Sequence, residues 1–302
     1  MKVHFNKSWL HSTWLRFFIL ALFSIVSVSV MDAKEKEDVV KILAIGNSFS
    51  VDALENHFYE LAQAAGKKVV VGNMYIGGCS LKRHLVNARE NKPAYKYYKR
   101  GLDGVNVKTP DYTLEAALAD EQWDYVTLQQ QSGKSGLYES WEESFPALLE
   151  YVRARVPEDA VIMIHQTWAY DVMSGHKDFA RYDKDQMKMY TSIMDAVRKI
   201  SSTTGVKDVI PCGTAVQNAR TTSLGNYICR DGYHLHKIYG RYVAACTWLE
   251  KILGVNPVGN PYRPDEMTSE QQLLAQKAAH MAVRKPYKVT RISASRKCGL
   301  RN

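Results

Sequence analysis

A serine stands directly after the first apolar run of the chain body, where a β-strand would end. The run 41–45 (KILAI) leads into 46–50 (GNSFS), which places Ser48 just past the strand. Ligands of open α/β sheets bind beyond the carboxyl ends of the strands, so the Ser48 hydroxyl is a candidate nucleophile. A serine in this place is also a frequent N-cap of the helix that follows, so position alone leaves both roles open.

The second chemical signal lies far downstream, in the segment 231–234 (DGYH). An acid close to an imidazole can orient it as a general base, which is the arrangement that a serine nucleophile requires. A D-x-x-H segment alone is also typical of a surface turn. Because both signals occur in one chain, we predict a triad of Ser48, His234 and Asp231.

The rest of the body alternates between strand and helix patterns, which favours βαβ units and a parallel sheet. Residues 87–110, rich in Tyr and Lys, show no clear period and predict a long loop beside the active face. Residues 255–267 predict an irregular, proline-containing connector. The predicted strands are 41–45, 68–74, 124–128, 160–165 and 207–210, and the predicted helices are 52–65, 114–119, 140–155, 185–200, 238–253 and 269–283.

Over residues 41–255 the chain resembles the SGNH, or GDSL-type, hydrolases, and within them the secreted bacterial SGNH-like proteins of uncharacterised function. The resemblance rests on Ser48 in its G-N-S turn, on the glycine block 77–80 (GGCS) and on the late D-x-x-H. It implies an α/β fold, a flavodoxin-like three-layer α/β/α sandwich with a five-stranded parallel sheet. It also implies that Ser48 is the nucleophile, that His234 is the base with Asp231 as its partner, and that the N–H groups of Ser48 and Gly78 hold the oxyanion.

The chain departs from the family pattern at the third block, where a G-x-N-D motif normally supplies an asparagine to the oxyanion hole. Here the third predicted strand is followed by three glutamines, and a glutamine amide can donate the same hydrogen bond. We predict Gln130 as this donor, with Gln129 and Gln131 as alternatives.

Four residues near the ends of the predicted strands are candidate substrate contacts: Asn47, Gln129, His165 and Trp168. Trp168 and its neighbour Tyr170 suit stacking on a sugar ring, and they equally suit a place in the core. No metal site is predicted for His165 or His236, since no carboxylate cluster accompanies them, and no cofactor is expected.

The N-terminus reads as a signal peptide over residues 1–33. Basic residues precede an apolar stretch of about 14 residues, shorter than the roughly 20 needed to span a bilayer, and small residues follow. An uncleaved anchor is the alternative. No cysteine lies near the cleavage region, which argues against a lipoprotein, and the location implied is secreted or periplasmic.

The formal net charge of +9 belongs to the ends of the chain. Residues 277–302 carry eight Lys and Arg and no acid, and the leader is also basic, so the body between them is close to neutral. We expect the tail to be a solvated end rather than a site for nucleic acid or acidic glycans. The odd count of five cysteines leaves at least one unpaired, and Cys229 with Cys246 could be a bridge or two buried thiols.

These observations predict a signal peptide (1–33), an SGNH hydrolase-like domain (34–255) and a C-terminal connector, helix and basic tail (256–302). The predicted function is hydrolysis of O-acyl esters, acetyl above all, on carbohydrate by a Ser-His-Asp mechanism. A non-catalytic glycan-binding protein and a lipase or thioesterase are the alternatives. The expected partner is a small-molecule or glycan ester, without nucleic acid and without stable membrane insertion after signal cleavage; the oligomeric state is left open.

Overall fold

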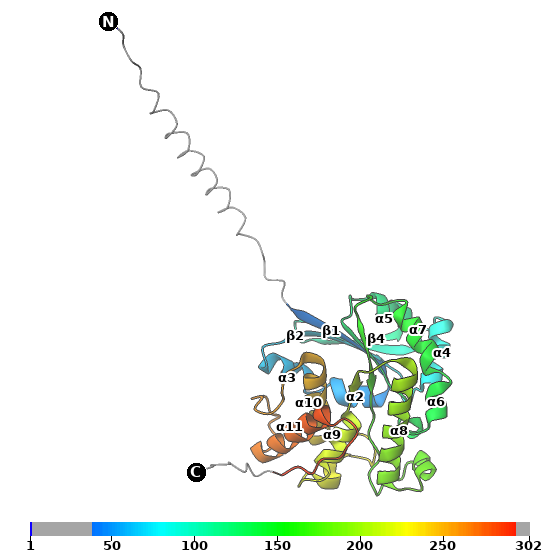
Figure 1. The fold of residues 1–302 in the computed structure, drawn as a ribbon, viewed down its shortest axis with the longest axis vertical. Helices are drawn as coiled ribbons and strands as arrows, with labels where there is room; N and C mark the ends of the chain where they lie inside the picture. The colour runs from blue at the N-terminus through cyan, green and yellow to red at the C-terminus, as the bar shows by residue number, and fades with distance from the viewer. Residues whose placement is uncertain (2–37, 294–302) are drawn as a thin grey trace. The chain divides into compact units, whose positions relative to one another are not determined.

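The computed structural model describes Met1 and residues 38–293, and the fold is formed by the unit that begins at Val39 (Figure 1). The predicted signal peptide, the end of the basic tail and Cys298 lie outside the described residues. Within the described part of the chain, no helix combines the length and the apolar character needed to cross a bilayer.

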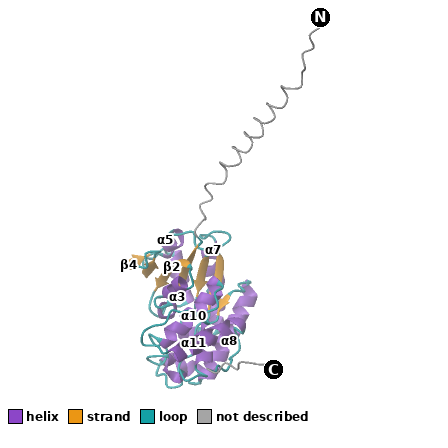
Figure 2. Ribbon diagram, turned by 90° about the vertical axis from the view of Figure 1, so that its left-hand side faces the viewer, coloured by secondary structure: helices purple, strands orange, loops and turns teal. Residues whose placement is uncertain are grey.

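A single seven-stranded sheet forms the centre of this unit, in the order β4-β3-β2-β1-β5-β6-β7. All five predicted strands are present and parallel, and helices cover both faces, so the three-layer α/β/α fold is confirmed (Figures 1 and 2). The parallel strands are β1 (Val39–Gly46), β2 (Lys68–Tyr75), β5 (Tyr125–Leu128), β6 (Val161–His165) and β7 (Val209–Ile210).

Two further strands, β3 (Tyr95–Arg100) and β4 (Asn106–Tyr112), extend the sheet antiparallel beyond β2. They correct the predicted loop over 87–110 and raise the strand count from five to seven. The physical reason is that buried and exposed side chains alternate here, which the many tyrosines make hard to see in the sequence. Tyr95 and Tyr97 are buried while Lys96 between them is exposed, which is the pattern of a half-buried strand.

Two helical layers flank the sheet, as the contacts between helices show (Figure 1). One layer holds α2 (Ser48–Leu54), α3 (Phe58–Ala64), α9 (Cys212–Ala219), α10 (Tyr239–Leu253) and α11 (Ser269–Arg284). The other holds α4 (Leu81–Arg89), α5 (Leu114–Ala119), α6 (Tyr138–Glu142), α7 (Phe145–Arg153) and α8 (Gln186–Thr204).

Two predicted helices are each divided in two. The predicted helix 52–65 breaks at His57, whose φ of 71° is left-handed and ends regular helix geometry between α2 and α3. The predicted helix 140–155 consists of α6 and α7, and Pro146 sits in the first turn of α7, where its missing N–H costs no helical hydrogen bond.

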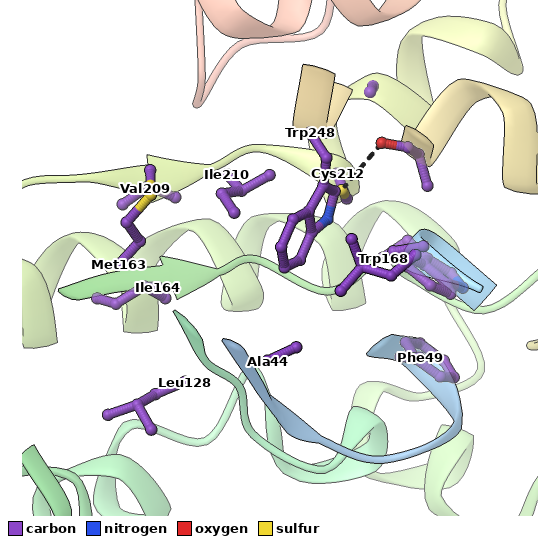
Figure 3. Packing of buried hydrophobic residues seen from close by; sticks show 14 of the residues in the cluster. Ala44, Phe49, Leu128, Met163, Ile164, Trp168, Val209, Ile210, Cys212 and Trp248 are labelled. Carbon is purple, nitrogen blue, oxygen red and sulfur yellow. Dashed lines mark hydrogen bonds between the residues drawn. The ribbon is translucent and has the colours of Figure 1, made fainter. Parts of the chain in front are cut away.

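The core joins the sheet to the layer that contains α10. Trp248 is fully buried beside Cys212 and the ends of β6 and β7, and Phe49 and Trp168 close the same core toward β1 (Figure 3). Cys229 and Cys246 are both buried free thiols, which decides between the two states that the sequence left open.

The C-terminal segment is part of the same unit up to residue 293. Helix α11 packs on α9 and α10, and hydrogen bonds fix the irregular stretch after it, two of them close to its end. The Thr290 N–H donates to Asn218 Oδ1 at 2.6 Å, and the Ile292 N–H donates to Thr221 Oγ1 at 3.0 Å. The expectation of a solvated end is therefore wrong as far as residue 293, because buried Ile292 supplies the apolar anchor.

Candidate active site

The structure brings Ser48, His234 and Asp231 together. Ser48 Oγ lies 2.9 Å from His234 Nε2, and His234 Nδ1 lies 2.7 Å from Asp231 Oδ2. Since a carboxylate only accepts, Nδ1 carries the proton that bonds to Asp231, and Nε2 is left to accept the Ser48 hydroxyl proton. This is the hydrogen-bond chain of a serine nucleophile with an oriented base.

The loop that carries the base is built around the Asp231 carboxylate. Its Oδ1 accepts the backbone N–H groups of Tyr233 at 3.2 Å and His234 at 2.8 Å. Burial raises the pKa of Asp231, but the bonds from the His234 ring and from these two N–H groups outweigh it, so the pKa lies below its ordinary value. Gly232 completes the turn with a φ of 87°, and a Cβ there would lie 2.9 Å from the Ser174 backbone.

Ser48 is not the N-cap of the helix that follows it. Asn47 is the cap, and its Oδ1 accepts the Phe49 N–H at 3.0 Å, so Ser48 occupies the first helical position with its hydroxyl turned to His234. The alternative role of Ser48 as the helix cap is therefore wrong, because the preceding residue, Asn47, caps the helix.

Asn47 also ends a buried amide chain that runs across the sheet. His165 Nδ1 donates to Gln129 Oε1 at 2.9 Å, Gln129 Nε2 donates to Asn47 Oδ1 at 2.7 Å, and Asn47 Nδ2 donates to the Cys79 carbonyl at 3.0 Å. The four residues lie at the carboxyl ends of β6, β5 and β1 and in the loop between β2 and α4. The chain fixes the orientation of both amides, because only Asn47 Oδ1 can accept from Gln129.

The predicted substrate contacts of Gln129 and His165 are therefore corrected, whereas Asn47 also lines the pocket beside Ser48, so its contact with substrate stays a prediction. Asn47, Gln129 and His165 are at most 1% exposed and are linked by the hydrogen bonds of this chain, which makes them positioning residues. Burial also lowers the pKa of His165 to about 3, so the ring is neutral.

The prediction that Trp168 contacts substrate is also wrong. It is fully buried, its ring stacks on Phe49 with centroids 4.1 Å apart, and its Nε1–H donates to the Tyr233 carbonyl at 2.7 Å. The core role that the sequence left open is the one observed. Trp168 holds the loop that carries His234 against the helix that begins at Ser48, and it is not a lining residue of the pocket.

The prediction of Gln130 as the oxyanion donor is wrong, because its side chain does not line the pocket beside Ser48. Its Nε2 donates to the Ser140 carbonyl and Oγ, and its Oε1 accepts the Leu81 N–H at 3.0 Å, so the side chain connects α4 to α6. Gln131, one of the two alternatives, lines the pocket beside Ser48 instead. Its Nε2 makes one long bond of 3.3 Å to Asp178, which leaves its second N–H available.

Ser48 lines a pocket of about 240 Å³. Gly78 lies in its wall with a φ of 61° and open space where a Cβ would be, so its backbone is accessible. The lining residues are Asn47, Ser48, Tyr75, Gly77, Gly78, Gln131, Ser132, His176, Tyr233 and His234. A larger hollow of about 430 Å³ between α6, α7 and α8 has no serine, cysteine or histidine among its lining residues.

A buried ion pair that the sequence analysis missed joins the two segments of the site. Asp52, on the turn of α2 after Ser48, is 1% exposed and pairs with Arg241 at 2.7 Å and Arg230 at 3.2 Å. The signal was present as an acid four residues after the serine, but an acid at that spacing on a helix is usually solvated. Among the described residues, no group of three or more His, Cys, Asp or Glu is placed to hold a metal ion.

A model of the domain of unknown function DUF4886 matches residues 41–282. The chain belongs to the DUF4886 family. The crystal structure of a DUF4886 family protein from Bacteroides uniformis ATCC 8492 is similar to it at 50% identity and a TM-score of 0.83, covering 84% of this chain and 98% of that one. No curated protein matches.

Two more remote structures are similar to this DUF4886 member. One is a candidate SGNH hydrolase from Slackia heliotrinireducens, at 22% identity and a TM-score of 0.49 over 71% of this chain and 100% of that one. The other is Axe2, an acetylxylan esterase from Geobacillus stearothermophilus, at 13% identity and a TM-score of 0.47 over 70% and 94%. The predicted place in a family of uncharacterised function is confirmed by the DUF4886 match, and the two remote likenesses concern the overall fold alone.

Proposed function

We propose that this protein is a secreted serine esterase that hydrolyses O-acyl esters, acetyl esters above all, on carbohydrate. The observation that carries the proposal is the unbroken hydrogen-bond chain from Ser48 through His234 to Asp231, which opens into a pocket. A protein that only binds glycans has no need of a nucleophile, a base and an orienting acid at these distances.

The residues suggest the course of the reaction. His234 Nε2 takes the proton of Ser48 Oγ as the oxygen attacks the ester carbonyl, and the charged imidazole is stabilised by the Asp231 carboxylate. The same proton then passes to the departing alcohol oxygen, which leaves an acyl group on Ser48. Water, deprotonated by His234, attacks this acyl-enzyme, and Ser48 recovers its proton as the acid is released.

Three donors are available for the oxyanion that forms in both halves of this reaction. The N–H groups of Ser48 and Gly78 have no hydrogen-bond acceptor among the described residues. Gln131 adds a side-chain N–H in place of the asparagine usual in the third block. Such donors act on charge that develops in the transition state, so they accelerate the chemical step.

The pocket supports a short acyl group. Its volume of about 240 Å³ is shared between the acyl group and part of the alcohol, and Gly77 and Gly78 line it without side chains. The signal peptide predicted from the sequence supports a place outside the cytoplasm, where acylated glycans are exposed to such an enzyme.

Hydrolysis of p-nitrophenyl acetate by the purified protein tests the proposal, with Ser48→Ala as the inactivating variant. Ser202→Ala, at an exposed position of α8, is the matched control. We expect turnover in the wild type and the control and none in Ser48→Ala. Equal turnover in all three would refute Ser48 as nucleophile, and no turnover of any ester by the wild type would favour the binding protein.

A further inference from the structure

Tyr75 forms a wall of the pocket next to the proposed nucleophile. It is the last residue of β2, and the parallel register pairs it with Gly46, two residues before Ser48. Tyr75 is half-buried and lines the same pocket as Ser48 and His234. A large aromatic ring is therefore fixed by the sheet at the mouth of the site.

The antiparallel strands hold this ring from behind. The Tyr75 ring stacks on that of Tyr98 in β3, with centroids 5.7 Å apart and planes at 22°. The Lys108 ammonium of β4 lies 5.1 Å from the centre of the Tyr98 ring, and these two residues are paired in the β3–β4 register. The cation and the two rings form a stack that starts at the sheet edge and ends in the pocket wall.

The face of the Tyr75 ring that lines the pocket has no aromatic partner among the described residues. Among the described residues, Tyr98 is the only ring that contacts it, and its hydroxyl has no hydrogen-bond partner. Gly77 lies beside this hydroxyl, where a Cβ would come within 3.3 Å of it. A ring with one supported face and a free hydroxyl is suited to hold a ligand that has an apolar face and polar edges.

We propose that Tyr75 is the platform on which a pyranose ring of the ester's alcohol half stacks, held in place by Tyr98 and Lys108. This inference rests on the proposed function and specifies its substrate class. The C–H face of the sugar lies on the Tyr75 ring, its hydroxyls reach the Tyr75 hydroxyl, and the acyl group points to Ser48. Tyr75 thus sets the specificity for the alcohol and takes no part in the proton transfers.

Kinetics with two acetate esters test the platform. An O-acetylated methyl xyloside offers a pyranose ring, and ethyl acetate offers none. In Tyr75→Leu, which keeps an apolar side chain but loses the ring, we expect kcat/KM to fall about tenfold more for the xyloside than for ethyl acetate, mainly through KM. Tyr75→Phe retains most of the preference, and Tyr227→Leu, at a tyrosine 78% exposed, changes neither ester.

A binding measurement keeps the inference separate from the catalytic proposal. Titration calorimetry of the Ser48→Ala protein with the acetylated xyloside, with and without Tyr75→Leu, reports stacking even if no ester is turned over. Weaker binding on loss of the ring supports the platform. An equal fall in kcat/KM for both esters, or unchanged binding in the calorimeter, overturns it; absence of turnover in the wild type with ring-dependent binding refutes only the esterase.

Discussion

Asp52 and Leu235 connect the two halves of the proposed triad, because Asp52 Oδ2 accepts the Leu235 N–H at 2.8 Å. Asp52 lies one helical turn after Ser48, and Leu235 follows His234 directly. Arg230 and Arg241 neutralise the same carboxylate, and Arg230 also donates to the Leu235 carbonyl. The helix of the nucleophile and the loop of the base are thus fixed to each other by one buried ionic group.

The Asp52→Asn variant tests this connection. The amide keeps the shape but leaves two arginines without a counter-charge, and we expect a loss of about 3 kcal/mol in unfolding free energy. At a temperature where the variant is folded, kcat should also fall, because the Ser48–His234 distance is no longer fixed. Chemical denaturation and ester kinetics measure both. Asp195→Asn, at a side chain 75% exposed on α8, is the control; an equal stability in the two variants would contradict the role of Asp52.

Gln131→Ala should lower kcat for p-nitrophenyl acetate by about 10²-fold with little change in KM, since an oxyanion donor acts in the transition state. Gln130→Ala should behave in the opposite way. It leaves the Leu81 N–H without its acceptor, so the melting temperature falls while the folded enzyme keeps its turnover. If Gln130→Ala were the variant with low kcat and normal stability, the two assignments would have to be exchanged.

Gln129→Glu should disrupt the amide chain behind the nucleophile. The new carboxylate cannot donate to Asn47 Oδ1, and two acceptors then face each other in a buried place, at a cost of about 1–3 kcal/mol. Because Asn47 also holds the Cys79 carbonyl beside Gly78, we expect kcat to fall together with stability. Gln63→Glu, on the exposed side of α3, serves as the comparison. Wild-type kcat in Gln129→Glu would show that the chain has no positioning role.

Two buried histidines should make the protein sensitive to mild acid. Burial lowers the pKa of both His84 and His165 to about 3, whereas an unfolded histidine titrates at about 6.5. Below pH ~6.5 the unfolded chain binds protons that the folded chain does not, so stability is lost as the pH falls toward 3.

Each such histidine contributes a slope of about 1.4 kcal/mol per pH unit well below pH 6. Urea denaturation between pH 7 and pH 5 should therefore show a smaller loss in His84→Gln than in the wild type. The substitution keeps a donor and acceptor near Tyr95, whose hydroxyl lies 3.1 Å from His84 Nδ1. Parallel pH dependences would mean that this histidine does not limit acid stability.

The sequence predicted the parts of the fold whose side chains are plainly apolar or plainly polar. The parallel strands follow from short apolar runs, because strands covered on both faces have little polar surface. Ser48, Asp231 and His234 could be found because each stands at a strand end or in a short motif.

Other features depend on contacts between distant residues, which no local pattern reveals. Tyr95 and Tyr97 lie in a strand only because β2 and the helix layer cover one side of them. Gln129, Gln130 and Gln131 are chemically identical, and three different sets of partners give them three different roles. Asp52 gains its role only when Arg241 and Leu235 arrive from the last third of the chain.

The distance along the chain between Ser48 and His234 has a consequence for how the protein is made. The serine is among the first folded-domain residues to leave the ribosome, and the loop with the imidazole follows only after most of the domain has been synthesised. A nascent or truncated chain that stops before residue 234 therefore holds a serine without a base. Any ester hydrolysis by the proposed triad can begin only after the segment that carries His234 has been synthesised and has folded against α2.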